Sequence, residues 1–385
     1  MARCGARSLI SIVAGARPNF MKIAPIVRAL EAASPRFVYR IVHTGQHYDA
    51  EMNEVFFREL GIPEPAAFLG VGGGSHGEQT AKVMIAFEAD CLAHRPDLVL
   101  VVGDVNSTLA AALVAAKLNI PIAHVEAGLR SGDMAMPEEI NRCVTDALSD
   151  WFFVTEPAGL ENLRREGKAE DRIFHVGHVM VDNLFYQCAR LDGVDASVFP
   201  SNALKVRLGR YGVVTLHRPS NVETAEALAR MATALGTIAH ELPLIFPVHP
   251  RTRASLERFA VSISPKVHLT APLSYMEFLN LWRDAALVVT DSGGLQEETT
   301  ALGVPCITVR ENTERPITVD KGTNVLAGTR PESIIAAARQ ALASPKREAR
   351  RPHFWDGRAA ERIVSILAER LPMRTSAAGE HMKTR

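Results

Sequence analysis

The 385-residue sequence has few cysteines and no pattern that would use them together. Its five cysteines are widely scattered, and none forms a C-x-x-C pair with another. His, Cys, Asp and Glu residues also lack the spacing of a metal site. Scattered thiols of this kind are typical of reduced side chains in a cytoplasmic protein rather than of a disulfide framework. The sequence therefore predicts a cytoplasmic protein without a bound metal.

An excess of charge and a long apolar segment are missing as well. The 43 basic and 43 acidic residues give a formal net charge of zero. This balance argues against a nucleic acid or a membrane surface as the main partner. The apolar run at 9–13 is too short for a signal peptide, and the small-residue run at 109–116 is too short to span a membrane. We expect neither a nucleic-acid partner nor a membrane-bound protein.

The glycine fingerprint of dinucleotide-binding enzymes, G-x-G-x-x-G, is absent after the first expected strand, which argues against a nicotinamide-dependent dehydrogenase. That strand instead ends in Gly15-Ala16-Arg17-Pro18, and Pro18 suits a first helical position. Arg17 and Lys22 flank this helix start, where the carboxyl end of a strand opens into a ligand crevice. Taken alone, these two residues are more typical of solvated surface charge.

Strand and helix signals alternate along almost the whole chain, which predicts an α/β fold with parallel sheets and helices on both faces. Two series of strands favour two Rossmann-like domains over one very wide sheet. The expected strands lie at 8–14, 38–43, 97–102, 120–125, 151–155 and 173–176, and then at 212–216, 244–248, 266–270, 285–290 and 304–309.

We place the join between the domains near 177–182, where a strand gives way to a helix. The expected domains are residues 1–178 and 179–357, the second of which contains the turn Asp291-Ser292-Gly293-Gly294. A last helix at 358–371 is expected to pack back on the first domain. The tail at 372–385 is small and polar, and we expect it to be disordered.

The stretch from Val288 to Glu298 contains the clearest ligand signal. A short apolar strand is followed by Asp291-Ser292-Gly293-Gly294 and a helix-forming run. This arrangement directs free backbone N–H groups and the helix dipole at an anion. Ser292 can cap the helix and still offer its hydroxyl, and the glycines allow a phosphate close to the backbone. One of Glu297 and Glu298 should then point past the phosphate, to the hydroxyls of a ribose. An ordinary capped helix start is the alternative.

Acidic residues follow strands of the first series. Asp104 could cap the next helix or act in the crevice, and the sequence leaves both roles open. Glu126 follows an apolar strand, so partial desolvation should raise its pKa toward the range useful for acid/base catalysis. The simplest role of Glu138 is to stabilise a helix N-terminus. Three acids that converge on one crevice nevertheless indicate general acid/base chemistry at carbon.

Cationic residues follow strands of the second series. A lone histidine in such a position is usually structural. His217 and His249 together, with Arg218 and the turn at Ser292, favour a cationic pocket for a diphosphate. Arg315 follows the next strand and is expected near the same rim.

Several segments together resemble the non-hydrolysing UDP-N-acetylglucosamine 2-epimerases, over residues 9 to 370. They are Gly15-Ala16-Arg17-Pro18, Gly103-Asp104, His124-Val125-Glu126-Ala127-Gly128-Leu129-Arg130, Pro137-Glu138-Glu139-Ile140-Asn141-Arg142, Asp291-Ser292-Gly293-Gly294 and Thr313-Glu314-Arg315-Pro316. The resemblance implies a glycosyltransferase-B-like fold, with two Rossmann-like domains facing a central cleft that holds the active site. It also implies an isomerase of polysaccharide biosynthesis that acts as a homodimer and needs no metal or other cofactor.

The implied reaction is the reversible epimerisation of UDP-N-acetylglucosamine at C2, which gives UDP-N-acetylmannosamine. UDP leaves by anti elimination and adds back to a 2-acetamidoglucal intermediate. By position, the resemblance assigns catalytic roles to Asp104, Glu126, Glu138 and His217, so it favours function over capping for Asp104. It assigns UDP contacts to Arg17, Ser292, Gly293, Gly294, Glu298 and Arg315, with Lys22 nearby. Glu298 would bind the ribose.

Two departures from the family pattern concern the sugar. The loop between Arg130 and Pro137 is shorter than in many members, and the segment 45–49 lacks the Arg that often follows Gln-His. The substrate could therefore be another UDP-2-acetamido sugar, such as a UDP-diacetamido uronic acid. A UDP-sugar glycosyltransferase would require an acceptor, whereas a hydrolysing epimerase would release free N-acetylmannosamine and UDP. A non-catalytic UDP-sugar sensor would have no use for the acids.

Overall fold

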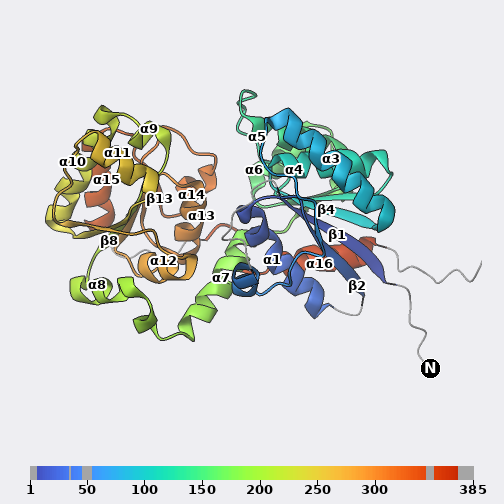
Figure 1. Ribbon diagram of the computed structural model, residues 1–385, viewed down its shortest axis with the longest axis horizontal. Coiled ribbons are helices and arrows are strands. Elements are labelled where there is room, and N and C mark those ends of the chain that lie inside the picture. Colours follow the sequence, from blue (N-terminus) through green and yellow to red (C-terminus); the bar gives the residue numbers. More distant parts are fainter. Residues whose placement is uncertain (1–6, 34–35, 46–53, 344–350, 372–385) are drawn as a thin grey trace, which may run out of the picture. The chain divides into compact units, whose positions relative to one another are not determined.

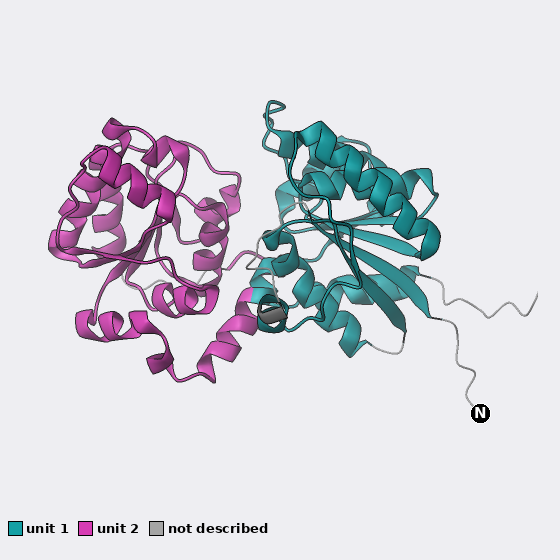
Figure 2. Cartoon of the chain, viewed as in Figure 1, with its two compact units in different colours: residues 1–183, 356–385 teal, residues 184–355 magenta. Residues whose placement is uncertain are grey.

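The computed structural model describes residues 7–33, 36–45, 54–343 and 351–371. The chain forms two compact units, shown in Figure 2. Unit 1 contains the described residues up to Asn183 and from Asp356 onward, and unit 2 contains those from Leu184 to Trp355. The boundary lies inside helix α7 (Val179–Asp192). The expected tail at 372–385 and the segment 46–49 lie outside the described residues.

Unit 1 is built on a seven-stranded parallel sheet in the order β3-β2-β1-β4-β5-β6-β7. Its strands are β1 (Ser8–Ala14), β2 (Phe37–His43), β3 (Ala67–Phe68), β4 (Leu98–Val102), β5 (Ile122–Val125), β6 (Trp151–Val154) and β7 (Ile173–His175). Residues of β4 alternate between two hydrophobic cores, with Leu98, Leu100 and Val102 facing one and Val99 and Val101 the other. Both faces of the sheet are therefore covered, as parallel sheets require.

Helices cover the two faces of this sheet. They are α1 (Arg17–Ala32), α2 (Glu54–Leu60), α3 (His76–Ala93), α4 (Asn106–Lys117), α5 (Pro137–Leu148), α6 (Pro157–Arg165) and α16 (Ala359–Arg370). Helices α1 and α16 share one core with the sheet, and α3 and α4 share the other (Figure 1). Asp182 of α7 accepts the backbone N–H groups of Ala359 and Ala360 at 3.2 and 2.7 Å, which anchors the start of α16 to unit 1.

Unit 2 repeats this plan with a six-stranded parallel sheet in the order β10-β9-β8-β11-β12-β13. The strands are β8 (Gly212–Thr215), β9 (Leu244–Pro247), β10 (Val267–Thr270), β11 (Leu287–Thr290), β12 (Cys306–Thr308) and β13 (Asn324–Leu326). The helices are α8 (Pro200–Leu208), α9 (Pro219–Val222), α10 (Ala225–Glu241), α11 (Pro250–Arg258), α12 (Tyr275–Trp282), α13 (Gly293–Leu302), α14 (Pro316–Asp320) and α15 (Pro331–Ala343). Two parallel sheets with helical layers confirm the predicted α/β class.

In both sheets the strand order reverses beside the first strand. Strand β1 lies between β2 and β4, and β8 lies between β9 and β11. Ligands of such sheets bind at the carboxyl ends of the strands where the order reverses. No helix among the described residues combines the length and the apolar character needed to cross a bilayer.

Candidate active site

In unit 1, Glu126 follows β5 in a backbone conformation that is rare for a residue with a side chain. Its φ is +68°, and its side chain is buried, with an exposed fraction of 3% for the residue. The N–H of Glu126 donates to the carbonyl of Phe153 at 3.0 Å, which holds the turn in place. Strained backbone of this kind is concentrated at functional sites. The sequence predicted the burial of Glu126 but gave no sign of the strain.

Lys22 forms an ion pair with Glu126, and only 14% of its side chain is exposed. The expectation of a solvated surface charge at Lys22 is therefore wrong. Gly103 makes room for this pair, because a Cβ at Gly103 would lie 3.0 Å from the Lys22 Nζ and 3.6 Å from a Glu126 oxygen. The ends of β4 and β5 and the helix after β1 thus meet at a buried carboxylate and its ammonium partner.

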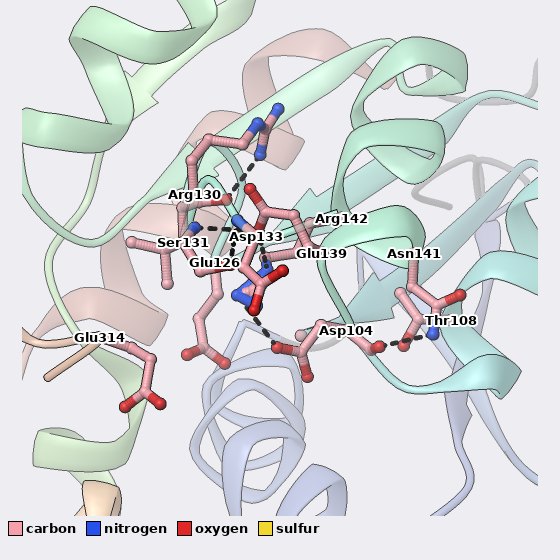
Figure 3. A network of polar contacts seen from close by, with 12 residues as sticks. Asp104, Thr108, Glu126, Arg130, Ser131, Asp133, Glu139, Asn141, Arg142 and Glu314 are labelled. Carbon is pink, nitrogen blue, oxygen red and sulfur yellow. Dashed lines mark hydrogen bonds and ion pairs between the residues drawn. The ribbon is translucent and has the colours of Figure 1, made fainter. Parts of the chain in front are cut away.

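Asp104 follows β4 and is half-buried. The residue at the N-cap of α4 is Val105, so Asp104 does not occupy the capping position that the sequence left open for it. Its carboxylate lies 3.5 Å from the Arg142 guanidinium, which also lies 3.2 Å from the carboxylate of Glu139 (Figure 3). Asn141 donates to the backbone carbonyl of Asp104 at 2.8 Å. The first two turns of α5 therefore hold Asp104 in place.

Glu139 is a second buried acid, which the sequence did not single out. It accepts the N–H groups of Ser131 and Gly132, both at 2.9 Å, so it fixes the loop before α5. Burial alone would raise the pKa of Glu139, but these hydrogen bonds and the charge of Arg142 hold the pKa below its ordinary value. Glu138, the predicted catalytic residue, lies half-buried in the same turn. The two neighbouring acids thus differ in burial, as they would if one were structural and the other accessible.

The turn after β1 lies close to the start of α4. A Cβ at Gly15 would lie 2.2 Å from the Ser107 hydroxyl, so only glycine fits there without displacement. Asn19 accepts the N–H of Ala16 at 3.0 Å and donates to Val102 at 3.3 Å, which links α1 to β4. Arg17 begins α1, and its guanidinium lies 5.1 Å from the centre of the Phe56 ring.

In unit 2, Asp291 organises the loop after β8. It is fully buried and accepts the N–H groups of His217 and Arg218 at 3.1 and 3.0 Å. It also lies 3.0 Å from the Nδ1 of His217, whose side chain is 50% exposed. Burial would raise the pKa of Asp291, but hydrogen bonds from His217, Asn221 and Arg218 lower it. The exposed part of the His217 ring is held at the carboxyl end of β8 as a result.

The turn at Ser292 corrects one expectation and leaves another open. Ser292 occupies the N-cap position of α13, but its side chain makes no capping hydrogen bond, so the predicted cap is wrong. Its backbone N–H instead donates to the Thr290 hydroxyl at 2.9 Å. A Cβ at Gly293 or Gly294 would meet no atom within 4 Å. Packing within the protein therefore does not require these glycines, and a ligand that approaches the backbone there stays a prediction.

The neighbouring acids Glu297 and Glu298 have different partners. Glu297 forms an ion pair with Arg315, and Glu298 accepts a hydrogen bond from the Tyr275 hydroxyl at 3.1 Å. Arg315 is thereby held at the start of α14. His249 is exposed at the N-cap of α11, and its Nδ1 accepts the Arg251 N–H at 3.2 Å. His249 thus makes a local structural hydrogen bond, and its expected part in the cationic pocket stays a prediction.

The structure places the predicted residues in two groups, each at the carboxyl ends of the strands of one sheet. Unit 1 carries Arg17, Lys22, Asp104, Glu126 and Glu138, and unit 2 carries His217, Arg218, His249, Ser292, Gly293, Gly294, Glu298 and Arg315. No group of three or more His, Cys, Asp or Glu side chains suited to a metal ion occurs in the part of the chain that the structure describes.

Comparison with known proteins identifies the family. The family model described as UDP-N-acetylglucosamine 2-epimerase matches residues 28–368. The UDP-N-acetylglucosamine 2-epimerase of Methanocaldococcus jannaschii is 43% identical over 364 residues, which cover 93% of this chain and 98% of the relative. The UDP-2,3-diacetamido-2,3-dideoxy-D-glucuronate 2-epimerase of Pseudomonas aeruginosa is 38% identical over 363 residues, which cover 94% and 99%.

A solved structure agrees with these matches. The crystal structure of the Methanocaldococcus jannaschii UDP-GlcNAc 2-epimerase in complex with UDP-GlcNAc and UDP has a TM-score of 0.80 and 41% identity, and it covers 94% of this chain and 99% of that chain. The fold is therefore glycosyltransferase-B-like, as the ordered motifs implied. The chain belongs to the UDP-N-acetylglucosamine 2-epimerase family.

Proposed function

We propose that this enzyme epimerises UDP-N-acetylglucosamine at C2 to UDP-N-acetylmannosamine without hydrolysis. The observation that carries the proposal is the set of acids on the strand ends of unit 1, with a buried and strained Glu126 beside Lys22. The Methanocaldococcus jannaschii relative, crystallised with UDP-GlcNAc and UDP, supports the same substrate.

The chemistry requires what unit 1 offers. A base removes H2 of the sugar as a proton, the C–H electrons form the C1–C2 double bond, and the C1–O bond breaks as UDP leaves with its electrons. A proton is then returned to C2 from the opposite face, and the UDP oxygen bonds to C1 again. Two faces of one carbon need two acid/base groups. We propose that both come from the set Asp104, Glu126 and Glu138.

Unit 2 offers what the leaving group needs. The diphosphate gains negative charge as the C1–O bond breaks, and N–H groups at the start of α13 with Arg315 would stabilise that charge. Glu298, held by Tyr275, would accept hydrogen bonds from the ribose hydroxyls. We assign His217, the partly exposed partner of Asp291, to the catalytic set and Arg17, Lys22, Arg218 and His249 to substrate binding.

A second substrate is favoured by one comparison. The Pseudomonas aeruginosa relative, at 38% identity over nearly its full length, acts on a UDP-diacetamido uronic acid. The same acids would serve that reaction, because the proton is again removed from a carbon beside C1. We further propose that the protein acts as a cytoplasmic homodimer. Light scattering of the purified protein would test the oligomeric state.

Proton NMR in deuterium oxide tests the proposed function. UDP-N-acetylglucosamine is supplied alone in one sample and the UDP-diacetamido uronic acid in another. We expect a C2-epimeric product that carries deuterium at C2, with no acceptor present. A product that retains protium at C2 would contradict the elimination mechanism. Accumulation of free N-acetylmannosamine and UDP would indicate a hydrolysing enzyme, and turnover of the uronic acid alone would identify the second substrate.

A further inference from the structure

His124, in strand β5, lies in a fully buried polar contact that the proposed reaction does not use. Its Nδ1 is 2.6 Å from a carboxylate oxygen of Asp146, in α5, and its Nε2 is 2.8 Å from the carbonyl oxygen of Gly103. Both His124 and Asp146 have no exposed surface. Buried polar groups of this kind are costly unless every one is paired.

The two hydrogen-bond partners of the His124 ring determine which of its nitrogens carry a hydrogen. The carbonyl of Gly103 can only accept a hydrogen bond, so Nε2 must donate. Asp146 accepts the N–H of Gly128 at 2.9 Å and lies 2.8 Å from the Arg130 guanidinium, and because both groups only donate, Asp146 is a carboxylate. A carboxylate also only accepts, so Nδ1 must donate as well. Only the imidazolium carries both hydrogens.

The contacts of this pair end beside the proposed catalytic acids. The peptide group of Gly103 directly precedes Asp104, and the N–H of Gly103 donates to the Val125 carbonyl at 3.0 Å. Gly103 is therefore tied to β5 through both its N–H and its carbonyl. At the other end, Asp146 accepts the N–H of Gly128, two residues beyond Glu126, at 2.9 Å.

The charges around Asp146 extend from the core to the surface. Arg130 lies 2.8 Å from the second oxygen of Asp146 and also 2.8 Å from the carboxylate of Glu166. Asp146 is thus faced by two cations, and Glu166 balances the outer one. An apolar pair of similar volume is often as stable as a buried ion pair, so stability alone does not account for these charges.

We infer that His124 and Asp146 are positioning residues, which form a buried imidazolium–carboxylate pair that holds the turns of Asp104 and Glu126 in the geometry for proton transfer. The pair touches neither substrate nor the reacting carbon in this role. It acts through the backbone at Gly103 and Gly128, and it accounts for how Glu126 keeps a strained φ. The inference rests on the proposed function, because it assumes that these two acids move the proton.

The variant His124→Asn tests the inference, with His94→Asn, on an exposed histidine of the same unit, as the matched control. Misplacing reacting groups by about 1 Å costs roughly 100-fold in rate. We therefore expect His124→Asn to lower kcat by roughly 100-fold, with UDP affinity unchanged because the proposed UDP contacts lie mainly in unit 2. His94→Asn should keep wild-type turnover. Wild-type turnover in His124→Asn would overturn the inference.

The same substitution in a chain that already carries Glu126→Gln distinguishes a positioning role of His124 from a purely structural role. If His124 acts through Glu126 and Asp104, its loss should cost less than about threefold in a chain that already carries Glu126→Gln, because coupled residues are not additive. An equal loss of kcat in both backgrounds would show that His124 contributes independently of Glu126 and would contradict the inference. Melting temperatures of the four proteins check that each variant is folded.

Neutron diffraction from crystals of the unsubstituted protein, grown in deuterium oxide at pH 7, requires no variant. We expect deuterium on both Nδ1 and Nε2 of His124, and a bare nitrogen at either position would overturn the charged pair. Failure of the proposed function can be distinguished from failure of the positioning role. A wild-type enzyme that never exchanges H2 rejects the function, whereas an active wild type with an equally active His124→Asn rejects only the positioning role.

Discussion

Units 1 and 2 share one architecture. In each unit an aspartate follows the strand that lies next to the first strand, but the two aspartates have opposite environments. Asp104 follows β4 and Asp291 follows β11, the strand that occupies the corresponding place in the second sheet. Asp291 is fully buried and is used by the N–H groups of His217 and Arg218. Asp104 is half-buried, and its carboxylate faces the guanidinium of Arg142. The same position in the fold thus supplies a structural acid in one unit and an accessible acid in the other.

The difference extends to the neighbouring acids. In unit 2, Glu297 holds Arg315 and Glu314 holds Arg310, so these carboxylates orient cations. In unit 1, the ammonium of Lys22 is held against the buried Glu126. Acid–cation pairs therefore occur in both units, but unit 1 also has the half-buried acids Asp104 and Glu138 near its strand ends. Accessible acids are suited to proton transfer, whereas oriented cations are suited to an anion such as a diphosphate. Single substitutions can test this division.

The largest expected effect is on turnover, from unit 1. Glu126→Gln, Asp104→Asn or Glu138→Gln removes a group that we propose for proton transfer, so kcat should fall on the order of 100-fold or more while UDP affinity stays largely intact. Steady-state kinetics and calorimetry with UDP measure the two quantities. Glu161→Gln, an exposed acid of the same unit, is the control and should behave as wild type. An acid variant that binds UDP poorly but turns over fully at saturation would reverse the proposed roles.

Asp291→Ala should lower the stability of the protein much more than Asp104→Ala does. The first leaves the N–H groups of His217 and Arg218 without the buried carboxylate that accepts them, which we expect to lower the free energy of unfolding by roughly 2–4 kcal/mol. Asp104 is half-buried, and the buried Arg142 guanidinium keeps Glu139 as its partner when Asp104 is removed, so this removal should cost less than about 1 kcal/mol. Urea denaturation of both variants makes the comparison, and equal losses would remove the distinction between the two aspartates.

The third prediction concerns UDP affinity, from unit 2. Arg315→Ala or Ser292→Ala should weaken UDP binding by roughly 1–3 kcal/mol, because each removes a hydrogen-bond donor that we propose for the charged phosphate. Calorimetry with UDP measures the effect. Arg230→Ala, on the exposed face of α10, is the matched control. Unchanged affinity in Arg315→Ala would exclude that residue from the phosphate contacts.

Local pattern was sufficient for most of the fold and for part of the site. Long apolar strands such as β1 and β4 and the turn at Ser292 follow from neighbouring residues, so the sequence predicted them. Strands β3 and β13 have only two and three residues, too few to show a periodicity. The pairing of Lys22 with Glu126 and the contacts of Glu139 depend on segments distant in the chain or on loop backbone. No spacing rule could have found them.

The smallest expected effect is the pH dependence of stability that Glu314 gives to unit 2. Burial would raise the pKa of Glu314, but two hydrogen bonds from Arg310 bring it to about 2, against an ordinary value of 4.5. A lowered pKa contributes stability above pH 4.5, and this contribution is lost as the pH falls through about 2. Glu314→Gln should therefore be less stable than wild type at pH 6, by roughly 1–2 kcal/mol. The gap should narrow steadily between pH 4.5 and pH 2.5 in urea denaturation, and a gap that stays constant would mean that the Glu314 charge does not contribute.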